Sequence, residues 1–408
     1  MTHSDASAGH RGKGLLPTLA LLTAVGPLAI DMYVPGFPAM SASLHAGASA
    51  VQLTLTAFLA GVVVGQLAIG PLSDVVGRRR PLVAGSVAFA VTALLCALST
   101  DIGELVVIRF VQGAAAAAGM VLARAVITDR FQGHDVPRHI ALLGQILCVA
   151  PVVAPVVGGG IISAWSWRAV FLTLCVLGLL LAVGVIVWVP ETLAPRLRHR
   201  AGPAGTFRSM GRLARHRPFL GNTLVLGLSS AALFAYISGS SFVFEHIHGL
   251  STSTYAGVFA VNSVGQLLAG TAFSRLARRV RVNTLLTVSV VAAVAGAFAQ
   301  VLFTALAGEN LAASWVTQLV TVSAFGMSVP AAMSLGQNLG RAAPGAASAL
   351  LGGLQFLFGA VATCLVGVFG EASSLPMGLI MLVALALAAL CLVTLVRPWD
   401  GHGEVVAH

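Results

Sequence analysis

The segment "GQLAIGPLSDVVGRRR", residues 65–80, joins two long apolar runs through glycines, an aspartate and three arginines. A second segment, "GQLLAGTAFSRLARRV" at residues 265–280, repeats its Gly, Gln, Leu, Gly, Arg and Arg in the same order and spacing. Each segment ends an apolar run and enters a short basic loop. The shared pattern in the same setting predicts that the chain consists of two similar halves.

The composition places these halves in a membrane. Of the 408 residues, 57% are hydrophobic and only 9% are charged, whereas a soluble domain carries about 25% charged residues. Such a chain has too few charged side chains to cover a water-exposed surface. We therefore expect an all-α integral membrane protein.

A transmembrane helix needs about 20 apolar residues, and the chain offers twelve such runs. We expect the helices at 15–36, 51–73, 81–99, 104–128, 139–162, 168–190, 219–243, 253–274, 283–305, 312–338, 345–368 and 375–396. With the N-terminus inside, 20 of the 23 Lys and Arg residues fall in the inner segments. Basic residues gather on the cytoplasmic side, so both termini are expected there. The net charge of +10 is then a topology signal and does not indicate nucleic-acid binding.

The longest polar segment, 191–218, separates the halves. The expected organisation is a cytoplasmic N-terminal tail at 1–14, a six-helix half at 15–190, a cytoplasmic linker at 191–218, a second half at 219–396 and a cytoplasmic tail at 397–408. Within the linker, Phe207 to Arg217 has the pattern of a basic amphipathic helix that lies on anionic lipid.

The segment "GPLSDVVGRRRPL", Gly70 to Leu82, resembles the signature between helices 2 and 3 of the major facilitator superfamily. Three further stretches resemble the bicyclomycin and chloramphenicol resistance exporters of its drug/proton antiporter group. They are "LAIDMYVPGFPAM" at 28–40, "RFVQGAAAAAGMVLARAVITD" at 109–129 and "GAASALLGGLQF" at 345–356. The chain departs from that group at Ala141, Ala150 and Ala154, where glycines are usual, and at Thr23, where some members have a second acid.

The resemblance implies a transporter in a bacterial cytoplasmic (inner) membrane. It would export amphipathic small molecules in exchange for protons, as a monomer and without a cofactor. A symporter or facilitator for a nutrient or metabolite on the same fold is the alternative. An enzyme is not expected, because the sequence has no catalytic dyad and no phosphate-binding loop. The five cysteines fall in apolar runs and predict neither a disulfide framework nor a metal site.

Asp31 is the one acidic residue of thirteen that lies clearly inside a predicted span. A charge at that depth costs roughly 2.5–3.5 kcal/mol on insertion scales, so intramembrane acids are generally functional. Arg109 has a similar depth in the fourth span. We expect Arg109 to tune Asp31, directly or through water, with Gln112 completing the network. A static ion pair that only orients two helices is the alternative.

Asp74, Arg78 and Asp129 form a second set at the inner ends of helices. The resemblance implies that they latch the inner side in the outward-open state. Gly70 and Gly77 are expected to allow tight turns and close packing there. A purely topogenic role for the arginines is the alternative.

Pro151, Pro155, Gly158 and Gly159 mark the fifth span, where we expect a bent helix and close helix crossings. Static packing explains these residues as well as rocking of the halves does. Arg124 is either a snorkelling helix-end residue or a second cation of a central cavity. The remaining residues expected to line that apolar cavity are Tyr33, Gln52, Phe58, Met120, Phe234, Tyr236, Asn262, Trp315, Gln318, Asn338, Gln355 and Phe358.

Overall fold

Helices form all the regular structure in the described chain, which comprises residues 4–131, 135–193, 204–369 and 373–404 of a computed structural model. Twelve helical segments in these residues are long and apolar enough to cross a membrane. The prediction of an all-α membrane fold with twelve spans is confirmed.

The first half contains seven α-helices and a short 3-10 turn. Their bounds are α1 Ser4–Asp31, η1 Val34–Gly36, α2 Phe37–Ser43, α3 Ala48–Val76, α4 Arg79–Leu98, α5 Ile102–Arg130, α6 Asp135–Ala164 and α7 Trp167–Trp188. The linker contributes α8, Ala204–Arg215. This helix lies close to the amphipathic helix predicted at 207–217.

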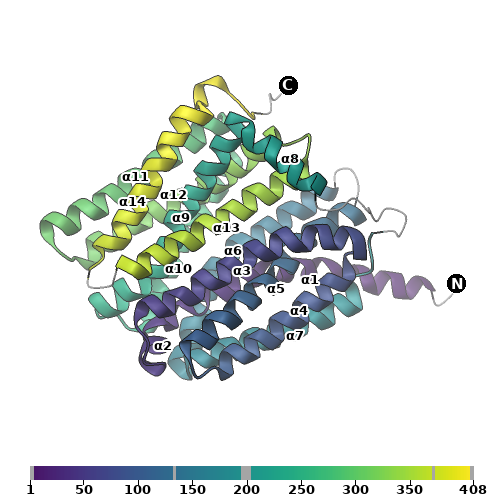
Figure 1. Cartoon of the computed structure of the whole chain (residues 1–408), viewed down its shortest axis with the longest axis horizontal. Helices are drawn as coiled ribbons and strands as arrows, with labels where there is room; N and C mark the ends of the chain where they lie inside the picture. The colour runs from purple at the N-terminus through teal and green to yellow at the C-terminus, as the bar shows by residue number, and fades with distance from the viewer. Residues whose placement is uncertain (1–3, 132–134, 194–203, 370–372, 405–408) are drawn as a thin grey trace.

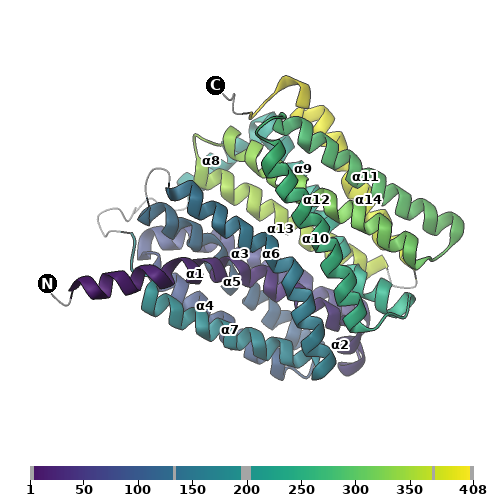
Figure 2. The same ribbon diagram turned by 180° about the vertical axis from the view of Figure 1, so that it is seen from behind.

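The second half contains α9 Arg217–Ser241, the π-helical turn η3 Phe242–Ile247, α10 Thr252–Leu276, α11 Val282–Ala307, α12 Leu311–Leu339, α13 Pro344–Phe369 and α14 Leu375–Cys391. The π-helical turn η4, Leu392–Val396, and the 3-10 turn η5, Pro398–Asp400, follow. Figures 1 and 2 show α1–α7 and α9–α14 as two groups of helices side by side. Both chain ends lie toward the end of the molecule that carries α8, which we call the linker end, and α2 lies at the opposite end (Figure 1).

The two groups meet along two equivalent pairs of helices. Helix α3 packs against α13, and α10 packs against α6. In each pair, the second span of one half meets the fifth span of the other. Gly65 lies against Ala114 of α5, and Gly265 lies against Ser323 of α12, so the repeated segments also have matching neighbours. The internal repeat of the sequence therefore corresponds to the same helix packing in both halves.

The first span differs from the prediction of one helix over 15–36. Helix α1 ends at Asp31, and the chain continues through η1 into α2. Pro35 explains the break, because it has no N–H to donate to the Asp31 carbonyl and it disfavours helical geometry at Val34. The Gly36 N–H instead donates to the Tyr33 carbonyl at 2.8 Å. Asp31 is therefore the last residue of a helix that stops within a span.

The last predicted segment is the tail at 397–408, of which the structure describes residues 397–404. Its described part folds back onto the second half, where Glu404 Oε1 accepts from the Asn283 backbone N–H at 3.0 Å and from Asn283 Nδ2 at 2.9 Å. The Gly403 carbonyl accepts from Asn338 Nδ2 at 2.9 Å. This segment therefore connects the start of α11 with the end of α12.

Candidate functional site

Asp31 lies where the two halves meet, and it is 3% exposed. Its Oδ1 atom is buried and has no hydrogen-bond partner among the described residues. The negative end of a helix dipole disfavours an anion, and Asp31 occupies the C-terminal residue of α1. Burial disfavours the charged carboxylate further. The neutral acid therefore suits this position better than the anion does.

Helix α6 fixes the chain beside Asp31. Gly158 lies so close to the Met32 carbonyl that a Cβ at this glycine would collide with it. On the neighbouring face, a Cβ at Gly159 would come within 2.6 Å of the Ala256 Cβ on α10. The prediction of close helix crossings at these two glycines is confirmed. Pro151 and Pro155 lie inside α6, which continues through both without interruption.

Arg109 lies near Asp31 in depth but does not pair with it. Its Nη1 donates to Gln112 Oε1 at 2.6 Å, and its Nη2 donates to the Ala29 carbonyl at 3.1 Å. The guanidinium carbon is 4.2 Å from the ring centroids of both Tyr33 and Phe58. Arg109 is fully buried in this surrounding.

Of the two expected modes, the described residues show no direct Asp31–Arg109 contact, and tuning through water stays a prediction. Equal depth along two helices does not determine where the side chains point around each helix axis. The side-chain contacts of Arg109 with Gln112, Tyr33 and Phe58 all lie in the first half. The predicted partnership of Arg109 with Gln112 is confirmed.

Four predicted cavity residues lie together in the second half or at its boundary. Asn262 Nδ2 donates to the Tyr236 hydroxyl at 2.9 Å, and Trp315 Nε1 donates to Asn262 Oδ1 at 3.2 Å. Gln318 is fully buried on the same helix as Trp315, with both side-chain amide atoms unpartnered. Tyr236, Asn262 and Trp315 thus form a buried hydrogen-bonded group in the second half.

Other predicted cavity residues serve the packing of the two halves. Tyr33 and Phe58 enclose Arg109 within the first half. Phe234 lies 5.9 Å from Phe356, centroid to centroid, and Phe358 lies against Gly227. Gln52 bridges the halves, because its Nε2 donates to the Ser238 carbonyl at 3.4 Å.

Three predicted cavity residues lie further toward the linker end of their helices, and a fourth lies midway along α13. Met120 is half-buried against Gly26, and Arg124, one turn further along α5, is exposed. Gln355 is half-buried on α13. Asn338 does not belong to a cavity. Its amide is held by the Gly403 carbonyl and by Arg341 Nη2 at 3.0 Å, because the C-terminal segment folds back over the end of α12.

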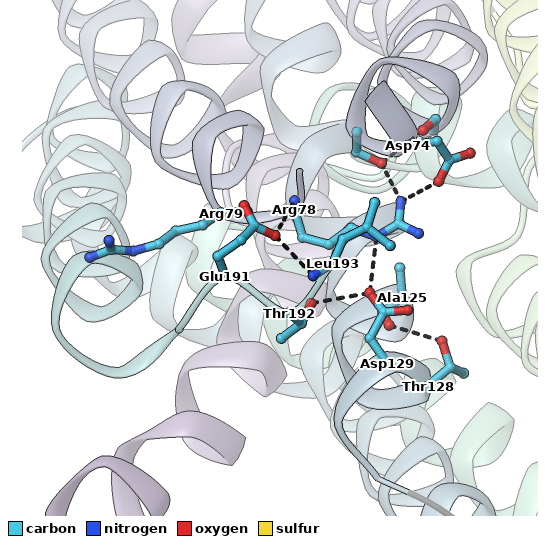
Figure 3. Close-up of polar contacts among 11 residues, drawn as sticks. Asp74, Arg78, Arg79, Ala125, Thr128, Asp129, Glu191, Thr192 and Leu193 are labelled. Carbon is cyan, nitrogen blue, oxygen red and sulfur yellow. Dashed lines mark hydrogen bonds and ion pairs between the residues drawn. The ribbon is translucent and has the colours of Figure 1, made fainter. Parts of the chain in front are cut away.

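Arg78 is the centre of a polar cluster at the linker end (Figure 3). Its Nη1 is 2.6 Å from Asp74 Oδ1 and its Nε is 3.1 Å from Asp129 Oδ2. Ser73 Oγ accepts from the same Nη1 at 2.5 Å. The three charged residues predicted to act together are therefore in contact. Gly77 adopts a φ of 95°, which favours glycine, and ends α3 beside them.

The linker completes this cluster with residues that the sequence analysis did not select. Glu191 Oε1 accepts from the Arg78 backbone N–H at 2.8 Å, which places a carboxylate at the start of α4. Thr192 Oγ1 donates to Asp129 Oδ2 at 3.1 Å. The polar start of the linker, directly after the sixth span, was the feature of the sequence that could have predicted these contacts. The prediction of close packing is wrong at Gly70, because a Cβ there would meet nothing within 4 Å.

Hydrogen bonds between the halves lie at the opposite end of the membrane region from this cluster. In the described residues, Ser49 Oγ donates to the Gly367 carbonyl and Gln52 donates to Ser238. Within the described residues, the hydrogen-bond partners of Arg78 belong to the first half and the start of the linker. The halves are therefore joined by polar contacts toward the α2 end.

Comparison with known proteins agrees with this architecture. The model of the Major Facilitator Superfamily matches residues 19–363. An uncharacterized MFS-type transporter of Bacillus subtilis, YdgK, is 36% identical over 388 residues, which cover 95% of this chain and 96% of that protein. A bicyclomycin resistance protein homolog of Haemophilus influenzae is 29% identical over 375 residues, which cover 88% and 90% of the two chains. The resemblance to bicyclomycin resistance exporters is confirmed by this match.

Solved structures show the same fold. The crystal structure of a D-xylose-proton symporter has a TM-score of 0.72 and 18% sequence identity, and covers 96% of this chain and 99% of that chain. At this identity the likeness concerns the arrangement of the helices alone.

Proposed function

The chain belongs to the Major Facilitator Superfamily, and we propose that this transporter exports amphipathic small molecules in exchange for protons by alternating access. The observation that carries the proposal is Asp31, a buried carboxyl with an unpartnered oxygen at the interrupted end of α1. Interrupted helices are common at the ion and substrate sites of secondary transporters. The bicyclomycin resistance homolog favours drugs over nutrients as the substrate class.

Asp31 supplies the coupling in this mechanism. The protonated side chain is neutral and stable at its buried position, whereas the carboxylate needs water or a cationic partner. Substrate arriving from the cytoplasm favours loss of the proton on that side. Protonation from outside then favours release of the substrate. One carboxyl therefore exchanges a proton for a substrate as access alternates.

Arg109 holds this carboxyl in place. Because α1 stops at Asp31, its last carbonyls lose helical partners, and Arg109 donates to one of them at Ala29. A cation also suits the C-terminal end of a helix. Arg109 thus acts on Asp31 through the backbone and its packing, without neutralising the carboxylate by direct contact.

The Arg78 cluster provides the gate. Asp74, Arg78 and Asp129 hold the linker ends of α3, α4 and α5 as one unit, and Glu191 joins the linker to it. In the proposed cycle this unit moves against the second half to close the cytoplasmic side. The open space beside Gly70, where an added Cβ would meet nothing within 4 Å, leaves room for that approach.

The orientation belongs to the same proposal. We place the linker end and both termini in the cytoplasm of a bacterial inner-membrane protein, because the basic residues concentrate there. A phosphatase reporter fused after Arg397 should then be inactive, whereas a fluorescent reporter at the same position should fold and emit. Phosphatase activity at that fusion would contradict the orientation.

The function is tested first by growth and then by transport. A drug-sensitive bacterial host that expresses the protein should tolerate more bicyclomycin or another amphipathic drug than the same host with an empty vector. Proteoliposomes should then move the protective drug against its gradient when a pH gradient is imposed. A transport rate that is the same with and without the pH gradient would favour the facilitator alternative.

A further inference from the structure

Residues 402–404 lie against the linker ends of two helices of the second half. Glu404 Oε1 accepts from the Asn283 backbone N–H at 3.0 Å and from Asn283 Nδ2 at 2.9 Å. The same Nδ2 donates to the His402 carbonyl at 3.3 Å. The Gly403 carbonyl accepts from Asn338 Nδ2 at 2.9 Å. Three consecutive residues therefore bind both the start of α11 and the end of α12.

The first half has an equivalent arrangement that is built from different residues. Glu191 follows the sixth span of its half, as Glu404 does in the second half. Glu191 accepts from the Arg78 backbone N–H at the start of α4, the third span. Thr192 Oγ1 donates to Asp129 Oδ2 at the end of α5, the fourth span. Since α11 and α12 are the third and fourth spans of the second half, the segment after the sixth span joins the same two helices in both halves.

The repeated loop segments differ in their acidic residues. At an offset of 200 residues, Asp74 corresponds to Ser274, so the second half has no counterpart of the carboxylate that binds Arg78. Residues 265–281, which lead into α11, contain no acidic residue at all. A carboxylate favours the start of a helix, where it meets free N–H groups and the positive end of the dipole. In the second half this carboxylate comes from Glu404.

The backbone at Gly403 makes the contact with α12 a close one. Gly403 has a φ of 79°, and a Cβ at this position would lie 2.9 Å from the Leu335 carbonyl oxygen and 3.1 Å from Leu339 Cγ. Gly401 has a similar φ of 67°, but a Cβ there would meet nothing within 4 Å. The two glycines thus share a backbone conformation that disfavours other residues, and they differ in their contact with α12.

We propose that residues 402–404 form a C-terminal clasp, which positions the linker ends of α11 and α12 as one unit and so builds the second half's side of the cytoplasmic gate. The gate role rests on the proposed function, because it assumes that access alternates between the two ends of the molecule. With the clasp in place, each half presents a preformed surface to the other when the cytoplasmic side closes. Without it, closure also has to order the ends of α11 and α12, which costs conformational entropy.

Hydrogen exchange of the full-length protein in lipid nanodiscs tests whether the clasp holds α11. The Asn283 N–H lies in the first turn of α11, where a helix provides no acceptor of its own. Glu404→Ala removes the acceptor and should raise the exchange rate of this turn about tenfold, because a hydrogen bond to a charged group is lost. Glu404→Gln keeps Oε1 as an acceptor and should exchange at close to the wild-type rate. Unchanged exchange in Glu404→Ala would overturn the clasp and leave the proposed function intact.

Distances between the two halves test whether the clasp acts on the gate. Val75→Cys and Leu276→Cys place spin labels at exposed positions near the linker ends of α3 and α10, in the full-length protein without its five native cysteines. The distance between the labels shortens as the linker ends of the halves approach each other. Gly403→Ala displaces the clasp from the Leu335 carbonyl and should shift the distribution toward longer distances.

Gly401→Ala is the matched control, because it introduces the same backbone strain without a collision and should keep the wild-type distribution. Equal shifts in the two glycine variants, or no shift in Gly403→Ala, would overturn the role of the clasp in the gate while the proposed function stands. If neither drug nor pH changes the wild-type distances, alternating access and the gate role are both contradicted. The exchange measurement then still decides whether residues 402–404 hold α11.

Discussion

Asp31 and Asp74 are carboxyl groups in the same half of the molecule with opposite surroundings. Asp74 is 2.6 Å from Arg78, which also contacts Asp129, and its side chain is 53% exposed. Asp31 is buried, and one of its oxygens has no partner. Asp74 is therefore part of an ion-pair cluster in contact with water. A buried carboxyl without a cation is sensitive to any proton or positive group that reaches it.

This difference separates two tasks. The Arg78 cluster stabilises the arrangement of neighbouring helix ends. Substitutions of its members that keep their hydrogen bonds should therefore cost little stability. In the proposed mechanism Asp31 stores and releases a proton, so an uncharged equivalent should not replace it. The following predictions are ordered from the largest expected effect to the smallest.

Gly158→Val should have the largest effect. The added side chain collides with the Met32 carbonyl and displaces the chain next to Asp31. Overpacking of this kind costs roughly 1–3 kcal/mol of stability. The yield of folded protein and the thermal midpoint in detergent measure the loss. Gly160→Val is the control, because Gly160 has open space around it; an equal loss in both variants would contradict the packing account.

Arg109→Lys tests whether charge alone is enough near Asp31. Lysine keeps the charge but lacks the planar fork that binds Gln112 and the Ala29 carbonyl while stacking on two rings. We expect drug export in proteoliposomes to fall about tenfold, the equivalent of about 1.4 kcal/mol. Full activity in the lysine variant would show that Arg109 acts only as a nearby charge.

Asp74→Asn should change folding least. Exposed ion pairs contribute about 0–1 kcal/mol, and Asp129 and Ser73 still hold Arg78. The thermal midpoint should therefore stay close to that of the wild type, while export falls because the balance between inward-open and outward-open states shifts. Normal export at the wild-type protein level would reduce Asp74 to a packing or topology residue.

The sequence predicted some of these arrangements because they depend on spacing along a helix. Asp74 and Arg78 are four residues apart, and Asp129 ends a span that returns to the same side, so their meeting followed from topology. The depth of Asp31 and Arg109 also followed from counting residues. The break after Asp31 was missed, although Pro35 was visible, because the apolar pattern continues through it.

The sequence could not predict in which direction a side chain points around its helix axis. It also could not predict that a distant segment folds back onto the helices. Nothing in the pattern shows that Arg109 stacks on Tyr33 and binds Gln112, with no direct contact to Asp31 in the described residues. Asn338 was taken for a cavity residue, because its contact with Gly403 depends on the fold of a distant segment. Tyr255 and Ser240 were not selected, because their hydrogen bond to each other depends on how two helices pack.

The most direct test of the central claim measures uphill export by Asp31→Asn and Asp74→Asn at matched protein levels. Proteoliposomes contain a drug that the wild-type protein exports at equal concentrations inside and outside, and a pH gradient is imposed. The account predicts that Asp31→Asn cannot move the drug against its gradient but retains downhill exchange, whereas Asp74→Asn keeps reduced uphill export. Undiminished uphill export by Asp31→Asn would place the coupling site elsewhere and make Asp31 a structural residue.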